Sequence, residues 1–129
     1  MKKELLFIDD NPMMGGFLSH LFGKAFEVKW CSTAEDALSS LQENYSPDLI
    51  ICDYELSGIN GYEFLQNIKS SGLHKDIPVL MLSGKGTSEN RIKCLKEGAE
   101  DFILKPFNPT ELNLKVINVL KKQEFSTIK

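Results

Sequence analysis

Five strand-sized apolar runs, separated by segments with the spacing of amphipathic helices, constrain the fold of this chain more than any other feature. Alternation of strands and helices along a whole chain is typical of a parallel sheet with helices on both faces. We therefore predict an α/β fold whose strands lie at residues 4–8, 26–31, 49–52, 79–82 and 101–104.

Local signals support these boundaries. Residues 49–52 and 79–82 are almost wholly apolar, as central strands covered on both faces are, whereas residues 26–29 alternate as an edge strand does. Cap residues and glycines mark the predicted helix ends. The expected caps are Asn11, followed by a proline, and Ser32, Asn60 and Asn108, each with a glutamate three residues later, and the expected stops are Gly23, Gly72 and Gly98.

The composition indicates one globular domain. A chain of 129 residues buries roughly two thirds of its unfolded surface, which is enough for one core. We assign residues 1–122 to this domain and residues 123–129 to a C-terminal tail. No apolar run approaches the length of a membrane span, and residues 1–4 resemble neither a signal peptide nor a transit peptide. We expect a cytoplasmic protein that does not contact a membrane.

Charge and cysteine content exclude further classes. The net charge of −3 lacks the basic excess of a nucleic-acid-binding protein, so we expect no direct nucleic-acid contact. Cys31, Cys52 and Cys94 are an odd number without C-x-x-C spacing, which argues against both a disulfide framework and a zinc site.

Polar residues follow four of the predicted strands at the point where each strand ends. The first strand is followed by Asp9 and Asp10, the third by Asp53, the fourth by Ser83 and the fifth by Lys105. Any one of them could simply begin a loop. Together they mark the carboxyl edge of the sheet, where open α/β sheets bind ligands. Carboxylates held close together repel unless a divalent cation joins them, and Mg2+ prefers carboxylate, water and phosphate oxygens. The pattern predicts a phosphoryl-transfer site that uses Mg2+ or Mn2+.

With these residues, the chain resembles the receiver domains of bacterial two-component response regulators, including those of chemotaxis regulators. The resemblance extends from the first strand through the last helix. It is carried by the acidic pair, the aspartate after the third strand, the serine after the fourth and the Lys-Pro after the fifth, and by the segments DYELSGING at 53–61 and GAEDFILKPF at 98–107. It implies a doubly wound, flavodoxin-like, five-stranded parallel sheet with the strand order 2-1-3-4-5.

The resemblance also implies roles for the acidic residues. Asp53 would be the phosphoacceptor, a carboxylate nucleophile that forms an aspartyl phosphate. Asp10 would bind the metal directly and Asp9 through water. The carboxylate of Asp53 and the backbone carbonyl of Glu55 would complete the protein ligands.

Three further residues have implied roles near the phosphoryl group. Ser83 would donate its hydroxyl to one phosphoryl oxygen, and Lys105 would pair with another. A lone lysine could instead lie along the surface, but the following Pro106 predicts a cis peptide that directs Lys105 inward. Phe102 matches the aromatic switch position, whose ring turns inward when Ser83 moves toward the phosphate. It could equally be an ordinary core aromatic.

Two sets of charged residues have implied regulatory or output roles. Glu55 and Lys85 occupy positions through which family members vary the lifetime of the phosphate. They could form an ion pair across the mouth of the site, or both could be solvated. The second set resembles the charged surface through which receivers of transcription factors dimerise, or is simply a solvated surface: Arg91, Asp101, Glu111 and Lys115.

We therefore predict a domain that takes a phosphoryl group from a histidine kinase or a histidine phosphotransfer protein and loses it slowly to water. Its output would be a changed contact with a downstream protein, a C-terminal output domain or a second copy. Two alternatives stay open. A phosphorylation-independent interaction module usually lacks one of the key residues, and all are present here. A haloacid-dehalogenase-like phosphatase would need a D-x-D pattern after the first strand, which Asp9-Asp10-Asn11 lacks.

Overall fold

One parallel sheet with helices on both faces makes up the fold of this computed structural model, which describes the backbone of residues 2–128 and the side chains of residues 2–124. The strand order is β2-β1-β3-β4-β5, with every neighbouring pair parallel, so the predicted fold class and order are confirmed. The strands are β1 (Lys3–Ile8), β2 (Phe26–Cys31), β3 (Leu49–Asp53), β4 (Val79–Ser83) and β5 (Asp101–Leu104).

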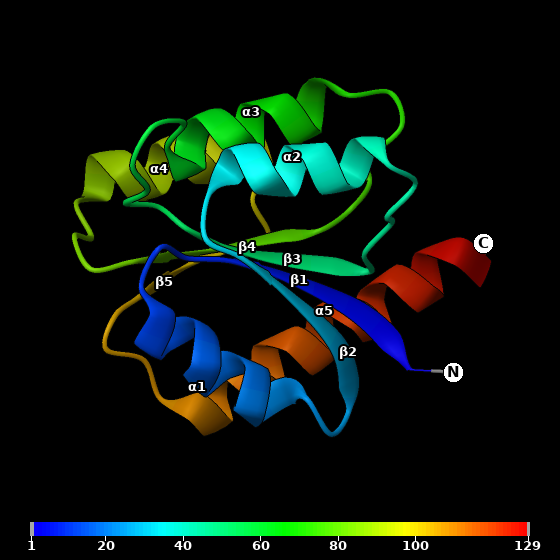
Figure 1. Cartoon of the computed structure of the whole chain (residues 1–129). Helices are drawn as coiled ribbons and strands as arrows, with labels where there is room; N and C mark the ends of the chain where they lie inside the picture. The colour runs from blue at the N-terminus through cyan, green and yellow to red at the C-terminus, as the bar shows by residue number, and fades with distance from the viewer. Residues whose placement is uncertain (1, 129) are drawn as a thin grey trace.

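The helices cover both faces of the sheet. Helices α1 and α5 lie on one face, and α2, α3 and α4 lie on the other (Figure 1). The bounds are α1 (Pro12–Phe22), α2 (Ala34–Gln42), α3 (Gly61–Ser70), α4 (Ser88–Glu97) and α5 (Pro109–Ile128).

Two apolar clusters form the core, one on each face of the sheet. Because successive side chains of a strand point to opposite faces, Leu6 and Ile8 pack with the residues of α2 and α3, whereas Leu5 and Phe7 pack with those of α1 and α5. Strands β3 and β4 are buried at every position, as predicted for central strands, and the edge strand β2 is partly exposed. Because neighbouring strands are parallel, their carboxyl ends lie at one rim of the sheet.

Most helix starts follow the predicted caps, with one correction. Asn11, Asn60 and Asn108 accept hydrogen bonds from backbone N–H groups of the first turns they precede, and Asn60 forms the complete capping box with Glu63. The prediction for α2 is wrong by one residue. Its cap is Thr33, whose hydroxyl accepts from the N–H of Asp36 at 3.0 Å, because the helix begins at Ala34.

The predicted helix ends are confirmed at Gly23 and Gly98, and of these two glycines only Gly98 has a positive φ, of 109°. Helix α3 is capped by Ser71, one residue before Gly72. Helix α5 continues through residues 123–128 of the predicted tail, where no glycine or proline signals a stop. Residue 129 lies outside the described residues, and the assignment of a domain boundary at residue 122 stays a prediction. None of the described helices is long and apolar enough to cross a membrane.

Candidate functional site

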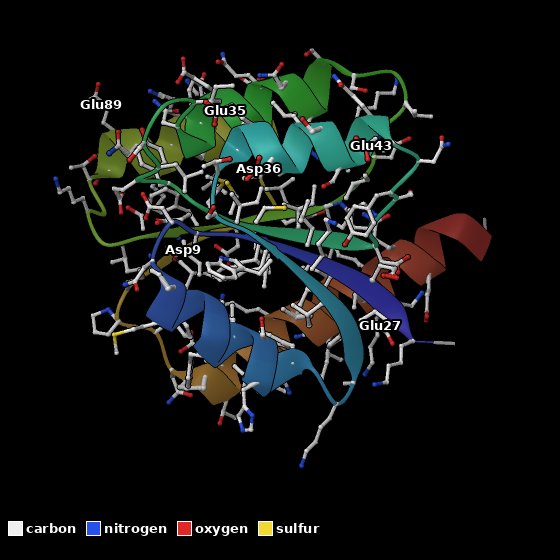
Figure 2. The ribbon with its side chains drawn as sticks, viewed as in Figure 1. Asp9, Glu27, Glu35, Asp36, Glu43 and Glu89 are labelled. Atoms are coloured by element: carbon white, nitrogen blue, oxygen red, sulfur yellow. The ribbon has the colours of Figure 1, made fainter. Side chains whose placement is uncertain are left out.

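Three aspartates meet at the carboxyl ends of β1 and β3. One carboxylate oxygen from each of Asp9, Asp10 and Asp53 lies within 4.8 Å of the others. The register explains this, because Ile8 pairs with Cys52 and the aspartates follow directly. Asp9 and Asp53 are buried and Asp10 is exposed. Figure 2 shows Asp9 at the same end of the molecule as Glu89, which marks the start of α4. The predicted acidic cluster therefore forms.

Lys105 reaches the buried part of this cluster from the end of β5. Its Nζ lies 3.1 Å from Oδ2 of Asp9 and 3.2 Å from Oδ1 of Asp53. The peptide bond between Lys105 and Pro106 is cis, as predicted. Burial acts to lower the pKa of Lys105, but the carboxylates of Asp53 and Asp9 outweigh it, so this pKa lies above its usual range. Lys105 is therefore a fixed positive charge in the site.

The carboxyl group of Asp53 has a perturbed pKa. Burial, and next the neighbouring charge of Asp9, raise the pKa of Asp53 to about 6, although Lys105 and the N–H of Glu55 oppose the shift. Both opposing groups lie on Oδ1, the N–H of Glu55 at 3.3 Å. No side chain or N–H among the described residues donates a hydrogen bond to Oδ2. That oxygen is thus available to a metal or to an electrophile.

Ser83 ends β4 beside Asp53 and is completely buried. Its hydroxyl donates to Oε2 of Glu55 at 2.5 Å, and the N–H of Gly84 donates to Oε1 of the same carboxylate at 2.8 Å. Among the described residues, Glu55 forms no ion pair with Lys85, so the suggested pair across the mouth of the site is absent. Glu55 turns instead toward donors on the neighbouring strand end, and Lys85 donates its backbone N–H to Oγ of Ser83 at 3.0 Å.

Phe102 lies inside the molecule, with 2% of its surface exposed. Its ring meets the ring of Tyr54 edge-on, with 5.9 Å between the centroids, and the Tyr54 hydroxyl donates to Oδ1 of Asn90 at 3.1 Å. The ring of Phe102 already points inward in this conformation. The role of Phe102 as a switch stays a prediction.

The sequence interpretation missed a contact between Trp30 and the site. The indole N–H of Trp30 donates to the backbone carbonyl of Asp9 at 2.8 Å. The ring lies against Gly15 of α1, where an added Cβ would come within 2.4 Å of it. Gly15 and Gly16 inside a helix were the available signal, because glycine weakens a helix interior and often indicates a close neighbour.

The predicted output residues lie on neighbouring elements, and two of them pair. Nζ of Lys115 on α5 lies 2.7 Å from Oδ2 of Asp101 on β5. Burial acts to raise the pKa of Asp101, but the hydrogen bonds from Lys115 and from the N–H of Phe102 outweigh it and lower this pKa. Arg91 on α4 and Glu111 on α5 are exposed. Neither forms an ion pair within the part of the chain described.

Comparison with known sequences decides the family. Residues 5–117 match the response regulator receiver domain. The chain belongs to this family. Phosphate regulon transcriptional regulatory protein PhoB of Escherichia coli is 32% identical over 123 residues, which are 95% of this chain and 53% of PhoB. Two-component response regulator ORR5 of Oryza sativa subsp. japonica is 33% identical over 118 residues, 91% of this chain and 88% of the relative.

Solved structures agree with this assignment. The CheY-like response regulator receiver domain protein from Methanospirillum hungatei has a TM-score of 0.91 and 28% identity, and the match covers 98% of this chain and 99% of that one. The chain spans about half the length of PhoB. It is a receiver domain of the two-component type, and receiver domains generally bind Mg2+ at an acidic pocket and interact with histidine kinases and output domains. Membership of this family does not favour the two alternatives, a haloacid-dehalogenase-like phosphatase and a phosphorylation-independent interaction module.

Proposed function

We propose that this domain accepts a phosphoryl group on Asp53 from a histidine kinase or a histidine phosphotransfer protein, in a Mg2+-dependent reaction in the cytoplasm. The observation that supports it most strongly is the position of Asp53. Its carboxylate is buried, contacts Lys105 through Oδ1, and lies with two further aspartates at the carboxyl edge of the sheet. Incubation with acetyl phosphate and Mg2+ tests the proposal: we expect one phosphoryl group per chain, and no incorporation would contradict it.

The residues present fit a Mg2+ ion. Three carboxylates within reach of one another supply the oxygen ligands that a hard divalent cation prefers. Asp10 and Asp53 would bind it directly, Asp9 through water, and the backbone carbonyl of Glu55 would add a fourth protein ligand. When bound, the ion would offset the negative charge of the carboxylates and the incoming phosphoryl group. Mn2+ would serve in the same way.

Three side chains of the site would take part in the phosphoryl transfer itself. An oxygen of Asp53 would form a bond to phosphorus while the phosphorus–nitrogen bond of the donor histidine breaks and the imidazole leaves with its electron pair. Lys105 already holds Asp53 and would stabilise negative charge on the phosphoryl oxygens. Ser83 would donate its hydroxyl to another of these oxygens. Hydrolysis of the aspartyl phosphate would return the domain to its starting state.

Replacement of Asp10 tests the metal ligands. We expect Asp10→Asn to weaken Mg2+ binding by at least about tenfold, because one anionic ligand is lost. Calorimetric titration measures this directly, and the fluorescence of Trp30 should report the same event since its indole is bonded to the backbone of Asp9. Asp76→Asn removes the same charge from an exposed position just before β4, at the opposite end of the sheet, and should leave the affinity unchanged. Equal affinity of Asp10→Asn and the unmodified domain would remove Asp10 from the site.

The surface of α4, β5 and α5 is the proposed output face, with a second copy of this domain as its partner. Charged residues of both signs lie on it beside apolar side chains that are unusually exposed, a combination that suits a self-complementary interface. The apolar members are Ile92, Leu95, Leu104 and Leu114, and the charged members are Arg91, Asp101, Glu111 and Lys115.

Self-association tests this face. We expect beryllofluoride with Mg2+ to shift the domain toward a dimer in analytical ultracentrifugation, and Arg91→Glu to weaken that dimer about tenfold or more, because like charges would then meet across the two-fold axis. Lys24→Glu, which makes the same charge change in the exposed turn after α1, is the control. Sedimentation as a monomer with and without beryllofluoride, at high protein concentration, would refute the dimer.

A further inference from the structure

We propose that the carboxylate of Glu55 competes with the phosphoryl group for the same hydrogen-bond donors, so that Glu55 must leave before Asp53 can carry a phosphate. The inference rests on the proposed function of Asp53 and assigns Glu55 a role that opposes it. Receivers vary the lifetime of their phosphate through this position, and in this chain Glu55 would act by occupying the Ser83 hydroxyl and the Gly84 N–H before phosphorylation.

Two adjacent donors at the end of β4 bind the two oxygens of this one carboxylate. The Ser83 hydroxyl lies 2.5 Å from Oε2, and the Gly84 N–H lies 2.8 Å from Oε1. The direction of the hydroxyl proton is fixed, because Oγ of Ser83 also accepts from the N–H of Lys85 and so presents its own proton to Glu55. Hydrogen bonds to an ionised acceptor are among the strongest that proteins form. The carboxylate is therefore held at a definite place rather than solvated.

That place adjoins the predicted phosphoacceptor. The N–H of Glu55 donates to Oδ1 of Asp53, and Asp53 pairs with Leu82, the residue before Ser83, across β3 and β4. A phosphoryl group attached to Asp53 and bonded to Ser83 would need the proton that Glu55 now accepts. A carboxylate and a phosphoryl group are both anionic acceptors, and they repel when close. Both cannot use the Ser83 hydroxyl at once.

Two consequences follow for the site. Displacement of Glu55 adds to the free energy that phosphorylation requires, so the site should be phosphorylated less readily than it would be without these contacts. Before phosphorylation, Glu55 also holds Ser83 and Gly84 in an anion-binding arrangement. The donors are therefore already oriented when the phosphoryl group arrives.

Two variants of Glu55 separate the effect of its contacts from that of its charge. Glu55→Ala removes both acceptors and the charge, whereas Glu55→Gln keeps one oxygen that can accept. Glu89→Gln is the matched control: it removes an equal charge from the exposed first turn of α4. All are titrated with beryllofluoride in saturating Mg2+, and the rate of labelling by acetyl phosphate is measured in parallel.

We expect Glu55→Ala to bind beryllofluoride about tenfold more tightly than the unmodified domain and to label faster by a similar factor, since two charge-assisted hydrogen bonds no longer have to be broken. Glu55→Gln should lie between the two, and Glu89→Gln should match the unmodified domain. In the metal-free domain, the NMR signal of the Gly84 amide proton should shift upfield in Glu55→Ala but not in Glu89→Gln, which shows directly that the hydrogen bond was present.

The opposite results overturn the inference in distinguishable ways. Equal or weaker binding of beryllofluoride by Glu55→Ala would mean that Glu55 does not compete. An unshifted Gly84 amide would mean that the contact is absent in solution. If neither the unmodified domain nor any variant bound beryllofluoride or took up label, the proposed function itself would fail, and the competition with it.

Discussion

Replacement of Asp53 by asparagine should abolish the incorporation of a phosphoryl group from acetyl phosphate. The amide is isosteric but has neither the charge nor the nucleophilic oxygen that attack on phosphorus requires. Only Asp53 among the three clustered aspartates combines burial, direct contact with Lys105 and a position at the end of the central strand β3. Phosphate-affinity electrophoresis or intact-protein mass spectrometry gives the stoichiometry.

A matched control separates this loss from a general effect of removing an aspartate. Asp76→Asn removes an exposed carboxylate at the opposite end of the sheet, and it should label like the unmodified domain. Circular dichroism should show that Asp53→Asn keeps its fold. Equal labelling of Asp53→Asn and the unmodified domain would assign the phosphoacceptor to another residue.

The same substitution should stabilise the metal-free domain at neutral pH. The pKa of Asp53 is raised from 3.8 to about 6, so between these values the folded state binds more protons than the unfolded state. The free energy of unfolding therefore falls as the pH rises through this window. At pH 7.5 the raised pKa of Asp53 lowers the free energy of unfolding by about 3 kcal/mol, at 1.36 kcal/mol per pKa unit. Asp53→Asn avoids this cost because its side chain does not ionise.

Urea denaturation in EDTA, at several pH values, measures the effect. The difference in free energy of unfolding between Asp53→Asn and the unmodified domain should be small at pH 4 and should grow to a few kcal/mol in favour of the mutant at pH 7.5. Groups far from Asp53 titrate alike in both proteins, so their contributions cancel in the difference. Added Mg2+ should reduce the gap at pH 7.5 by binding the ionised site. A mutant less stable than the unmodified domain at pH 7.5 in EDTA would show that Lys105 more than offsets the buried charge.

The sheet and the acidic cluster could be predicted because each depends on repeated signals. Five apolar runs and the helical spacing between them fix a parallel sheet, and a parallel sheet brings Asp9, Asp53 and Lys105 to one rim whatever the details of the loops. The predicted ends of β3 and β4 were one residue short, since Asp53 and Ser83 still belong to the ladder. A polar side chain at a strand end does not show whether backbone pairing continues.

The sequence did not predict the cap of α2 or the contacts of Glu55, because both depend on the path of loops. Ser32 and Thr33 can both cap a helix, and the path of the loop decides between them. For Glu55, the sequence offered Lys85 as a partner of opposite charge, but the buried donors at Ser83 and Gly84 lie closer to its carboxylate. Neither choice has a periodic signal: the cap depends on the local path of the loop before α2, and the contacts of Glu55 depend on the position of a segment far away in the sequence.

Trp30 connects three segments that are separate in the sequence: α1, β2 and the end of β1. The indole rests on the glycine in α1 and is hydrogen-bonded to the carbonyl of Asp9, so the surface helix and the edge strand together support the backbone of a buried aspartate. A side chain at position 15 would displace the ring, and the strain would reach Asp9 through the hydrogen bond of the indole. Variation at Gly15 and at Trp30 should therefore be coupled, with larger residues at one position tolerated only when the other becomes smaller.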